Sequence, residues 1–162
     1  MPTATLRFAT ADDVPLILQL IRELAEYERL ADQVTATERD LHDALFGPRP
    51  VVEVVLAETG GEVAGYALFF HNFSTFLCRR GVYLEDLFVR PAFRGRGIGK
   101  QLLAHLAQIA VDRGAQRFEW AVLDWNAPAI EFYRRMGARP LDDWTVFRLE
   151  NDALKRLSGS RA

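Results

Sequence analysis

The sequence predicts a single mixed α/β domain with one mostly antiparallel central sheet flanked by helices. The chain has 162 residues, which suits one domain over residues 1–162. Hydrophobic residues make up 49% and charged residues 26%, which is typical of globular proteins and excludes disordered or fibrous classes. The hydrophobic periodicity and the turn signals predict the element order β-α-α-β-β-β-α-β-α-β.

The first part of the chain predicts one strand and two helices. Residues 5–9 are expected to form the strand, and Thr10–Asp13 resembles a capping box with Pro15 in the first helical turn. A helix to about Tyr27 or Glu28 follows from the spacing of Leu16, Ile17, Leu20, Ile21 and Leu24. A second, shorter helix is expected over residues 37–46.

The middle of the chain predicts a hairpin and a third strand. Residues 51–57 and 63–70 are rich in β-forming residues and are separated by Thr59-Gly60-Gly61, which is a hairpin signal. Residues 71–80 are expected to form a loop. A further strand is predicted over residues 82–89, directly before a glycine-rich segment.

The last part of the chain predicts two helices and two strands. The apolar stripe that begins at Ile98 indicates a long helix ending near Gly114. Residues 118–123 are expected to form a strand and residues 127–136 a helix. A last strand is predicted over residues 145–149.

Composition excludes several classes of protein. The single cysteine, Cys78, excludes an intramolecular disulfide and a cysteine-based zinc site. The three histidines lack ligand spacing, so no metal is expected. No apolar run reaches the length of a membrane span, and the N-terminus lacks the layout of a signal peptide. We therefore expect a cytoplasmic protein without a membrane partner.

Charge is distributed unevenly along the chain, although the net charge is only −2. Residues 1–78 hold 5 basic and 12 acidic residues, whereas residues 79–117 hold 8 basic and 3 acidic residues. This distribution suggests one anionic and one cationic ligand, and scattered surface charge is the alternative. The arginines gather around one glycine-rich loop without a basic-aromatic stripe, so no nucleic-acid partner is expected.

The segment Arg94-Gly95-Arg96-Gly97-Ile98-Gly99-Lys100 lies between a predicted strand and a predicted helix. Glycines allow the backbone to approach a ligand closely, and the N–H groups of a helix start attract anions. The spacing fits neither a Walker loop nor a dinucleotide fingerprint. The residues therefore indicate a pyrophosphate cradle, with an ordinary tight turn as the alternative.

This segment resembles the acetyl-CoA loop of the GNAT acetyltransferases, whose pattern is Q/R-x-x-G-x-G/A. Arg94 occupies the first place, Gly97 the fourth and Gly99 the sixth. The predicted element order also fits the GNAT fold over about residues 5–150. The resemblance implies that acetyl-CoA is the cosubstrate.

A narrower resemblance is to the spermidine/spermine (diamine) acetyltransferase family. It rests on the motifs at 23–28, 83–89, 124–128 and 132–138, in that order. Residues 121–126, Ala-Val-Leu-Asp-Trp-Asn, resemble the thialysine acetyltransferase branch more closely than the polyamine branch. The resemblance implies acetyl transfer to a primary amine of a small cationic substrate, such as a polyamine, a diamine or thialysine. The alternatives are a GNAT enzyme acting on a protein lysine or N-terminus, and a non-catalytic CoA-binding module.

The resemblance assigns the acetyl-CoA site to three segments. The glycine loop, Arg94 to Lys100, would hold the pyrophosphate. A strand that separates from its neighbour would leave backbone groups free for the pantetheine arm, whereas routine pairing is the alternative. The full set is Leu87, Phe88, Val89, Arg94, Gly95, Arg96, Gly97, Ile98, Gly99, Lys100, Asn126, Ala127, Pro128 and Ala129. Asn126 also has a structural explanation as the N-cap of the following helix.

Two residues are expected to carry the chemistry. The resemblance implies that Tyr133 protonates the departing thiolate, and a core-packing tyrosine is the alternative. Glu85 would act as a base through water or as an anchor for the amine, although it could instead pair with a nearby arginine. Strand alternation places Glu85, Leu87 and Val89 on one face and Asp86 and Phe88 on the other.

The remaining expectations concern the acceptor amine and the assembly. The resemblance implies that Tyr27 and Glu28 reach the amine, with two solvated residues at a helix end as the alternative. Glu119 and Trp120 are assigned to the pocket wall. The resembling family forms homodimers, so a C2 dimer is expected, with residues 71–77 and Trp144 as candidate contacts.

Overall fold

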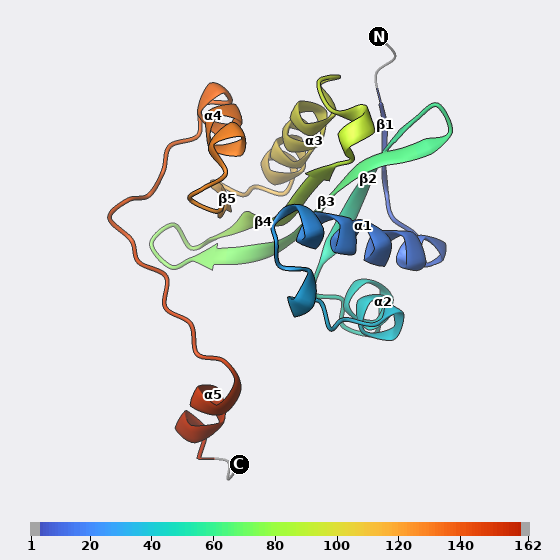
Figure 1. Ribbon diagram of the computed structural model, residues 1–162. Coiled ribbons are helices and arrows are strands. Elements are labelled where there is room, and N and C mark those ends of the chain that lie inside the picture. The colour runs from blue at the N-terminus through green and yellow to red at the C-terminus, as the bar shows by residue number, and fades with distance from the viewer. Residues whose placement is uncertain (1–3, 160–162) are drawn as a thin grey trace. The chain divides into compact units, whose positions relative to one another are not determined.

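One five-stranded sheet, in the order β1-β2-β3-β4-β5, organises the first part of the chain (Figure 1). The strands β1 to β4 pair antiparallel, and β5 runs parallel to β4. The expected mixed, mostly antiparallel sheet is therefore confirmed. The strands are β1 (Thr5–Phe8), β2 (Glu53–Thr59), β3 (Glu62–Ser74), β4 (Arg79–Val89) and β5 (Phe118–Trp120).

The computed structural model describes residues 4–159. Its backbone divides into two compact units, Met1–Ala121 and Val122–Ala162. The sheet lies in the first unit, and each unit is described by itself below. The expectation of one domain over residues 1–162 stays a prediction.

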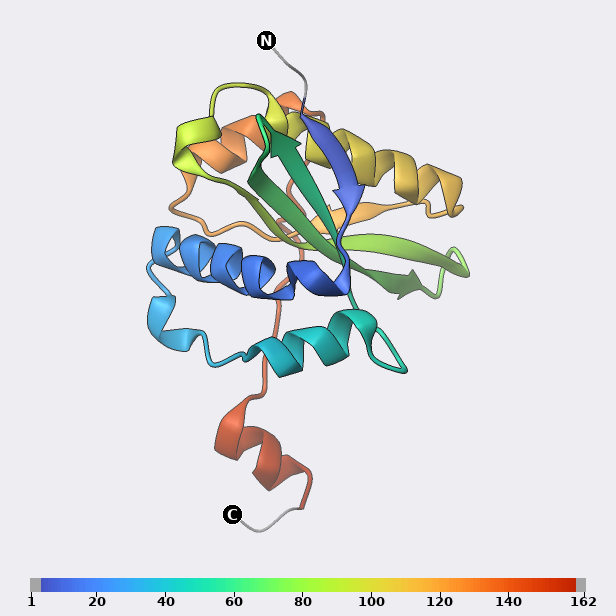
Figure 2. The ribbon, with the colours of Figure 1, turned by 90° about the vertical axis from the view of Figure 1, so that its right-hand side faces the viewer.

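Helices cover both faces of the sheet in the first unit. The helices α1 (Val14–Tyr27) and α2 (Glu38–Phe46) lie on one face, and α3 (Ile98–Asp112) lies on the other (Figures 1 and 2). Short 3-10 turns, η1 (Ala11–Asp13), η2 (Ala31–Gln33) and η3 (Pro91–Phe93), connect these elements. All three helices were expected, α1 and α3 from the spacing of apolar residues and α2 from its start and stop signals.

The apolar stripe of α1 explains why this helix packs on the sheet. Its buried residues recur at helical spacing, and they contact apolar side chains of α2 and of the strands β2, β3 and β4. This cluster includes Val14, Ile17, Leu18, Leu20, Leu24, Leu41, Leu45, Val54, Leu56, Tyr66, Leu68 and Phe88. Burial of this stripe fixes α1 beside the strands that lead to the glycine loop.

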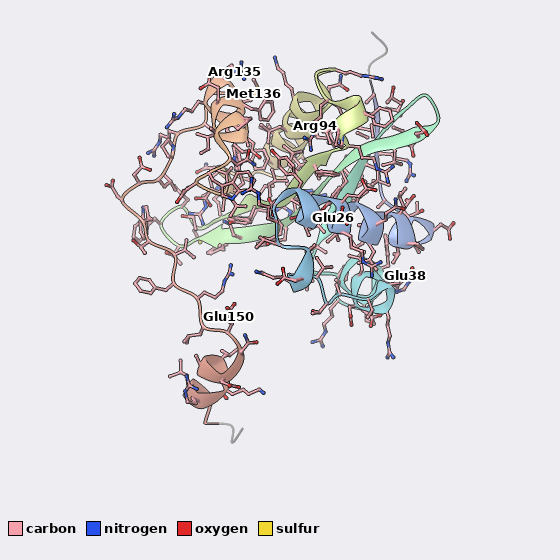
Figure 3. All side chains as sticks on the ribbon, viewed as in Figure 1. Glu26, Glu38, Arg94, Arg135, Met136 and Glu150 are labelled. Atoms are coloured by element: carbon pink, nitrogen blue, oxygen red, sulfur yellow. The ribbon has the colours of Figure 1, made fainter. Side chains whose placement is uncertain are left out.

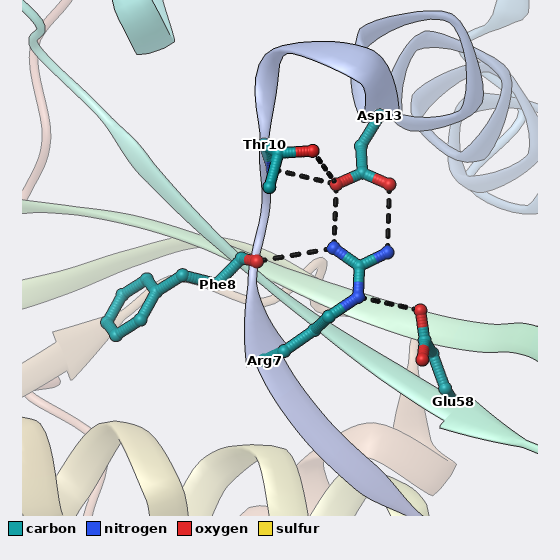
Figure 4. Close-up of polar contacts among 5 residues, drawn as sticks. All are labelled: Arg7, Phe8, Thr10, Asp13 and Glu58. Carbon is teal, nitrogen blue, oxygen red and sulfur yellow. Dashed lines mark hydrogen bonds and ion pairs between the residues drawn. The ribbon is translucent and has the colours of Figure 1, made fainter.

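A charge network fixes the start of α1 (Figure 4). The Arg7 guanidinium donates to both carboxylate oxygens of Asp13, at 2.7 and 2.9 Å, and to Glu58 at 2.7 Å. Asp13 also accepts from the backbone N–H of Thr10, which completes the expected capping box. The bond from Arg7 lowers the pKa of Asp13 to about 2.

The hairpin between β3 and β4 is longer than the sequence predicted. The expected loop over residues 71–80 is wrong, because Phe73 pairs with Arg80 and Ser74 pairs with Arg79. Only residues 75–78 form the turn. An antiparallel hairpin tolerates polar and exposed side chains, so its sequence can lack the alternation of apolar and polar residues that predicts a strand.

The second unit holds the helices α4 (Ala127–Arg135) and α5 (Asn151–Leu157). Helix α4 was expected, whereas α5 was not. The predicted strand over residues 145–149 is wrong, since this segment has no regular structure. The strand predicted over 118–123 ends at Trp120. A strand needs a partner for its backbone groups, and apolar residues alone do not supply one.

Candidate active site

The glycine loop has the backbone geometry of an anion cradle. Gly95 and Gly97 have φ values of 74° and 78°, in the region that favours glycine. Gly97 is the N-cap of α3, so the free N–H groups of the first helical turn begin at this point. A Cβ at Gly97 would meet no atom within 4 Å, which leaves the approach to these N–H groups open. The loop therefore fits a pyrophosphate group.

Three basic side chains surround this cradle. Arg94, Arg96 and Lys100 are exposed. The guanidinium of Arg96 donates to the carbonyl of Ala92 at 3.1 Å and lies 5.4 Å from the ring centre of Phe93. These contacts hold Arg96 along the loop. Arg94, Arg96 and Lys100 supply positive charge beside the helix N-terminus.

The end of β4 has one edge beyond the reach of β5. The pairing between β4 and β5 covers Val82–Leu84 and Phe118–Trp120. Leu87, Phe88 and Val89 pair on the other side with β3 and lie past the last pair with β5. The resemblance implies that backbone groups of this strand are available to a ligand, and that role stays a prediction.

A β-bulge shifts the register between β3 and β4 at Glu85. Leu68 pairs with Asp86 and Phe69 pairs with Leu84, so Glu85 is the extra residue on β4. The expected alternation holds from Asp86 to Val89. The bulge interrupts this alternation at Glu85, so the shared face of Glu85 and Leu87 stays a prediction. The side chain of Glu85 is exposed.

Carboxylates gather where the bulge meets the end of α1. Asp86 is half-buried and accepts a 2.9 Å hydrogen bond from the hydroxyl of Tyr66. Burial, with a smaller contribution from the negative charges of Glu85 and Glu28, raises the pKa of Asp86 to about 6, although the Tyr66 bond lowers it. Burial also raises the pKa of Glu28. The negative charges of Glu28 and Glu85 both act on Asp86, so the three carboxyl groups form an acidic cluster suited to a cation.

Tyr27 connects this cluster to the glycine loop. The Arg94 guanidinium lies 4.7 Å from the ring centre of Tyr27 and 5.8 Å from that of Phe88. Its Nε donates to the carbonyl of Val89 at 2.8 Å. Figure 3 shows Arg94 on the segment between β4 and α3. The structure thus brings Tyr27, Glu28 and Glu85 into the neighbourhood of the predicted acetyl-CoA loop.

Glu119 and Trp120, predicted for the pocket wall, lie on β5. Glu119 accepts a 2.9 Å hydrogen bond from the Asn72 amide and lies 3.1 Å from Nε of Arg117. Trp120 packs edge-on against Phe118, with ring centres 5.0 Å apart. Glu119 is therefore engaged by protein groups, and its contact with an amine stays a prediction.

Helix α4 of the second unit carries the other predicted residues. The side chain of Asn126 accepts from the N–H of Ala129 at 3.4 Å and caps the helix, and Pro128 lies in the first turn. Tyr133 is half-buried, with its ring centre 5.3 Å from that of Phe132. The N-cap role of Asn126 is confirmed. The roles of Tyr133 and of Asn126–Ala129 toward acetyl-CoA stay predictions.

The sequence reasoning missed Asp86 and Tyr66 as members of this site. Strand alternation had placed Asp86 on the same face as Phe88, and Phe88 is buried in the core. A carboxylate at a core-facing position of an apolar strand is itself a signal, because an unpaired buried charge is costly. That signal would have identified Asp86. Nothing local in the sequence indicates Tyr66 as its partner.

Within residues 4–159, no helix is long and apolar enough to cross a membrane. No group of three or more histidine, cysteine, aspartate or glutamate side chains in the same residues is arranged to hold a metal ion.

Comparison with known proteins decides the family. The sequence profile of the acetyltransferase (GNAT) family matches residues 17–138. The chain belongs to the GNAT family. This GNAT protein is 39% identical to the thialysine N-epsilon-acetyltransferase of Sus scrofa, over 98% of its own length and 99% of the relative. It is 36% identical to an L-ornithine N5-acetyltransferase of Arabidopsis thaliana, over 94% and 86% of the two chains.

A solved structure has a similar fold. An integron cassette protein from the mobile metagenome of V. cholerae superposes on this GNAT protein with a TM-score of 0.83 and 29% identity, over 99% and 100% of the two chains. The expected GNAT fold and the expected resemblance are thus confirmed. The protein is an N-acetyltransferase that acts on amines, and GNAT enzymes use acetyl-CoA as cosubstrate.

Proposed function

We propose that this enzyme transfers the acetyl group of acetyl-CoA directly to a primary amine of a small cationic substrate in a ternary complex. The observation that carries the proposal is the acidic cluster of Glu28, Glu85 and Asp86, which lies beside Tyr27 and Arg94 of the glycine loop. A cluster of negative charge near an anion cradle suits one cationic and one anionic reactant.

The acceptor amine must bind as a cation and react as a neutral amine. A free alkylammonium has a pKa of about 10, so it is almost fully protonated at neutral pH. The acidic cluster attracts this ammonium group. Glu85, exposed at the bulge, then accepts its proton through water or holds it electrostatically until solvent removes the proton.

The acetyl donor would be held by backbone and by charge. The loop from Arg94 to Lys100 would hold the pyrophosphate, and the free edge of Leu87–Val89 would hold the pantetheine arm. Residues Asn126–Ala129 are proposed to contact the same arm. Acetyl-CoA supplies an acetyl group activated as a thioester. Tyr133 is proposed to donate a proton to the leaving thiolate, as the resemblance implies.

The proposed acceptor is a polyamine, a diamine or a lysine analogue such as thialysine. The names of two relatives specify thialysine N-epsilon and ornithine N5 as acetylated positions, which are terminal side-chain amines. A relative named spermidine/spermine N(1)-acetyltransferase-like protein 1, of Homo sapiens, is 33% identical over 92% of this chain. These names support a small molecule with a terminal amine.

A panel assay tests this function. Release of free CoA thiol from acetyl-CoA would be followed with spermidine, spermine, putrescine, thialysine, ornithine and lysine, and with a peptide that has one lysine and a free N-terminus. We expect turnover with at least one small cationic amine and none with the peptide. Efficient acetylation of the peptide would favour the protein-modifying alternative. Binding of CoA without turnover on any amine would favour a non-catalytic module.

A homodimer in the cytoplasm is proposed as the assembly. The tip of the β3–β4 hairpin exposes Phe73, Phe76 and Leu77, and the side chain of Trp144 in the second unit is 78% exposed. Exposed apolar patches of this kind indicate interaction surfaces. Light scattering at micromolar concentration tests the dimer, and a monomer mass would contradict it.

A further inference from the structure

The last turn of α1 and the start of the glycine loop are joined by two contacts with matching spacing. Glu23 and Tyr27 are four residues apart on α1, so they lie on one helix face. Arg90 and Arg94, also four residues apart, flank the turn η3. Glu23 contacts Arg90, and Tyr27 contacts Arg94.

The contact between Glu23 and Arg90 is a bidentate ion pair. Nε of Arg90 donates to one carboxylate oxygen of Glu23 and its terminal nitrogen donates to the other, both at 2.8 Å. The side chains of Arg90 and Glu23 are only 22% and 28% exposed. The bond from Arg90 lowers the pKa of Glu23, so the carboxylate stays charged. Bidentate pairs of this kind fix orientation as well as distance.

Arg90 is itself fixed to the sheet. Its remaining terminal nitrogen donates to the carbonyl of Val63 at 3.0 Å, and its backbone N–H donates to the carbonyl of Ala64 at 2.9 Å. Arg90 directly follows β4 and precedes the turn that leads to Arg94. A rigid Arg90 therefore offers α1 an attachment point at the entrance of the glycine loop.

The C-terminal end of α1 needs such an attachment. Its buried apolar side chains end at Leu24 and Ala25, whereas Tyr27 is 38% exposed. The next residue, Glu28, belongs to the acidic cluster. Apolar packing thus fixes the body of the helix, and polar contacts fix the turn that carries the two proposed amine-binding residues.

We propose that Glu23 and Arg90 are positioning residues, which, together with the stacking of Arg94 on Tyr27, set the amine-binding end of α1 against the acetyl-CoA loop. This inference rests on the proposed function. The pair touches neither reactant in our assignment, and it acts by holding Tyr27 and Glu28 at a fixed place relative to Arg94. Small displacements of a substrate-positioning group are costly for the transfer rate.

The test compares Glu23→Gln with a matched control, Glu53→Gln. Glu53 also forms a bidentate ion pair, with Arg113, and the side chains of that pair have similar exposure, 30% and 37%. The control pair joins β2 to the end of α3 and not to the start of the glycine loop. We expect Glu23→Gln to lower kcat/KM for the amine roughly tenfold or more. The affinity for acetyl-CoA, measured by calorimetry, should change less than about twofold.

The control variant should give the opposite pattern. Glu53→Gln should lower the melting temperature as Glu23→Gln does, but it should leave kcat/KM for the amine near the wild-type value. Arg90→Lys keeps the charge without the planar fork, so its kcat/KM should lie between those of the wild type and Glu23→Gln. Equal losses of kcat/KM in the two glutamine variants, or no loss in either, would overturn the inference.

A double-mutant cycle tests whether the two contacts act together. Tyr27→Leu removes the ring under Arg94, whereas Tyr27→Phe keeps it. Loss of one contact should reduce the effect of losing the other, so Glu23→Gln with Tyr27→Leu should cost less than the product of the single losses. For Glu53→Gln combined with Tyr27→Leu, the fold-loss in kcat/KM should equal the product of the two single losses. Independent effects of Glu23 and Tyr27 would contradict a shared role.

Binding measurements separate this inference from the proposed function. If the wild-type enzyme turned over no small amine, the proposed function would fail, and calorimetry of spermidine and thialysine binding would replace the rate measurement. Weaker amine binding in Glu23→Gln than in Glu53→Gln would then still support the positioning pair. Failure of the wild-type protein to bind either amine would overturn both.

Discussion

The hydroxyl of Tyr66 donates a 2.9 Å hydrogen bond to the carboxylate of Asp86. Asp86 directly follows Glu85, the extra residue of the bulge in β4. Tyr66 is fully buried, so this bond holds a carboxyl group at the boundary between the core and the acidic cluster. Burial raises the pKa of Asp86 from 3.8 to about 6. The fold therefore keeps a carboxylate here at a cost in stability, which is common at functional sites.

Replacement of Asp86 by asparagine should increase stability and decrease activity. Since the pKa of Asp86 is raised in the folded state, ionisation destabilises the fold as pH rises from about 4 to 6, and the full cost remains above that range. At pH 8, Asp86→Asn should be more stable than the wild type by about 1–3 kcal/mol, measured by urea unfolding. Its kcat/KM for a cationic amine should fall roughly tenfold or more, because the ammonium group of the amine loses a charged hydrogen-bond partner.

A second variant separates charge from hydrogen bonding at this position. Asp86→Ala leaves the buried Tyr66 hydroxyl without its acceptor, so it should be less stable than Asp86→Asn. If Asp86→Asn were less stable than the wild type at pH 8, the ionised carboxylate of Asp86 would not lower the free energy of unfolding, and the prediction would be wrong.

Substitution of Gly97 should weaken acetyl-CoA binding beyond its effect on stability. Gly97→Ala places a Cβ at a φ of 78°, which costs about 1 kcal/mol, and the Cβ enters the open space before the N–H groups of α3. The matched control is Gly61→Ala, at a φ of 81° in the hairpin turn with similarly open space. Both variants should lose similar stability, but only Gly97→Ala should bind acetyl-CoA more weakly by calorimetry. Equal affinity in the two variants would argue against the cradle.

Loss of the Tyr133 hydroxyl should reduce kcat with little change in stability. Tyr133→Phe keeps the ring that packs against Phe132, so no cavity forms. If Tyr133 donates the proton, kcat should fall roughly 10²–10⁴-fold in a steady-state assay with a confirmed amine. Tyr83→Phe makes the same change at another half-buried tyrosine and should keep a kcat near the wild-type value. A wild-type kcat for Tyr133→Phe would return this residue to a packing role.

The Asp13 network should make the fold sensitive to acid. The pKa of Asp13 is lowered from 3.8 to about 2, so its stabilising contribution is complete above about pH 4 and is lost as pH falls toward 2. Asp13→Asn should cost about 2 kcal/mol at pH 7 and almost nothing at pH 2. Urea unfolding across this range measures the difference. Asp43→Asn, at an exposed side chain, should retain the wild-type pH dependence.

Local features of the site could be predicted from the sequence. The glycine loop, the Asn126 cap and the turn at Gly60-Gly61 each depend on a few neighbouring residues, whose conformational preferences act within one turn. Helices α1 and α3 followed from apolar spacing, and α2 and α4 from the residues at their ends, whereas α5 was not expected. The strand predicted over residues 145–149 failed, because strand formation depends on a distant partner that the apolar pattern does not reveal.

The sequence by itself determined the family and the class of enzyme and predicted where the anion cradle lies, because these reside in short motifs read in order along the chain. Tertiary structure alone decided which residues come together at the proposed amine-binding site. Glu85 is the extra residue in the register between β3 and β4, and Asp86 acquired its pKa from burial beside Tyr66, 20 residues away. Glu23 forms its ion pair with Arg90, which lies 67 residues later in the chain. Such contacts depend on strand register and helix packing, which no local pattern specifies.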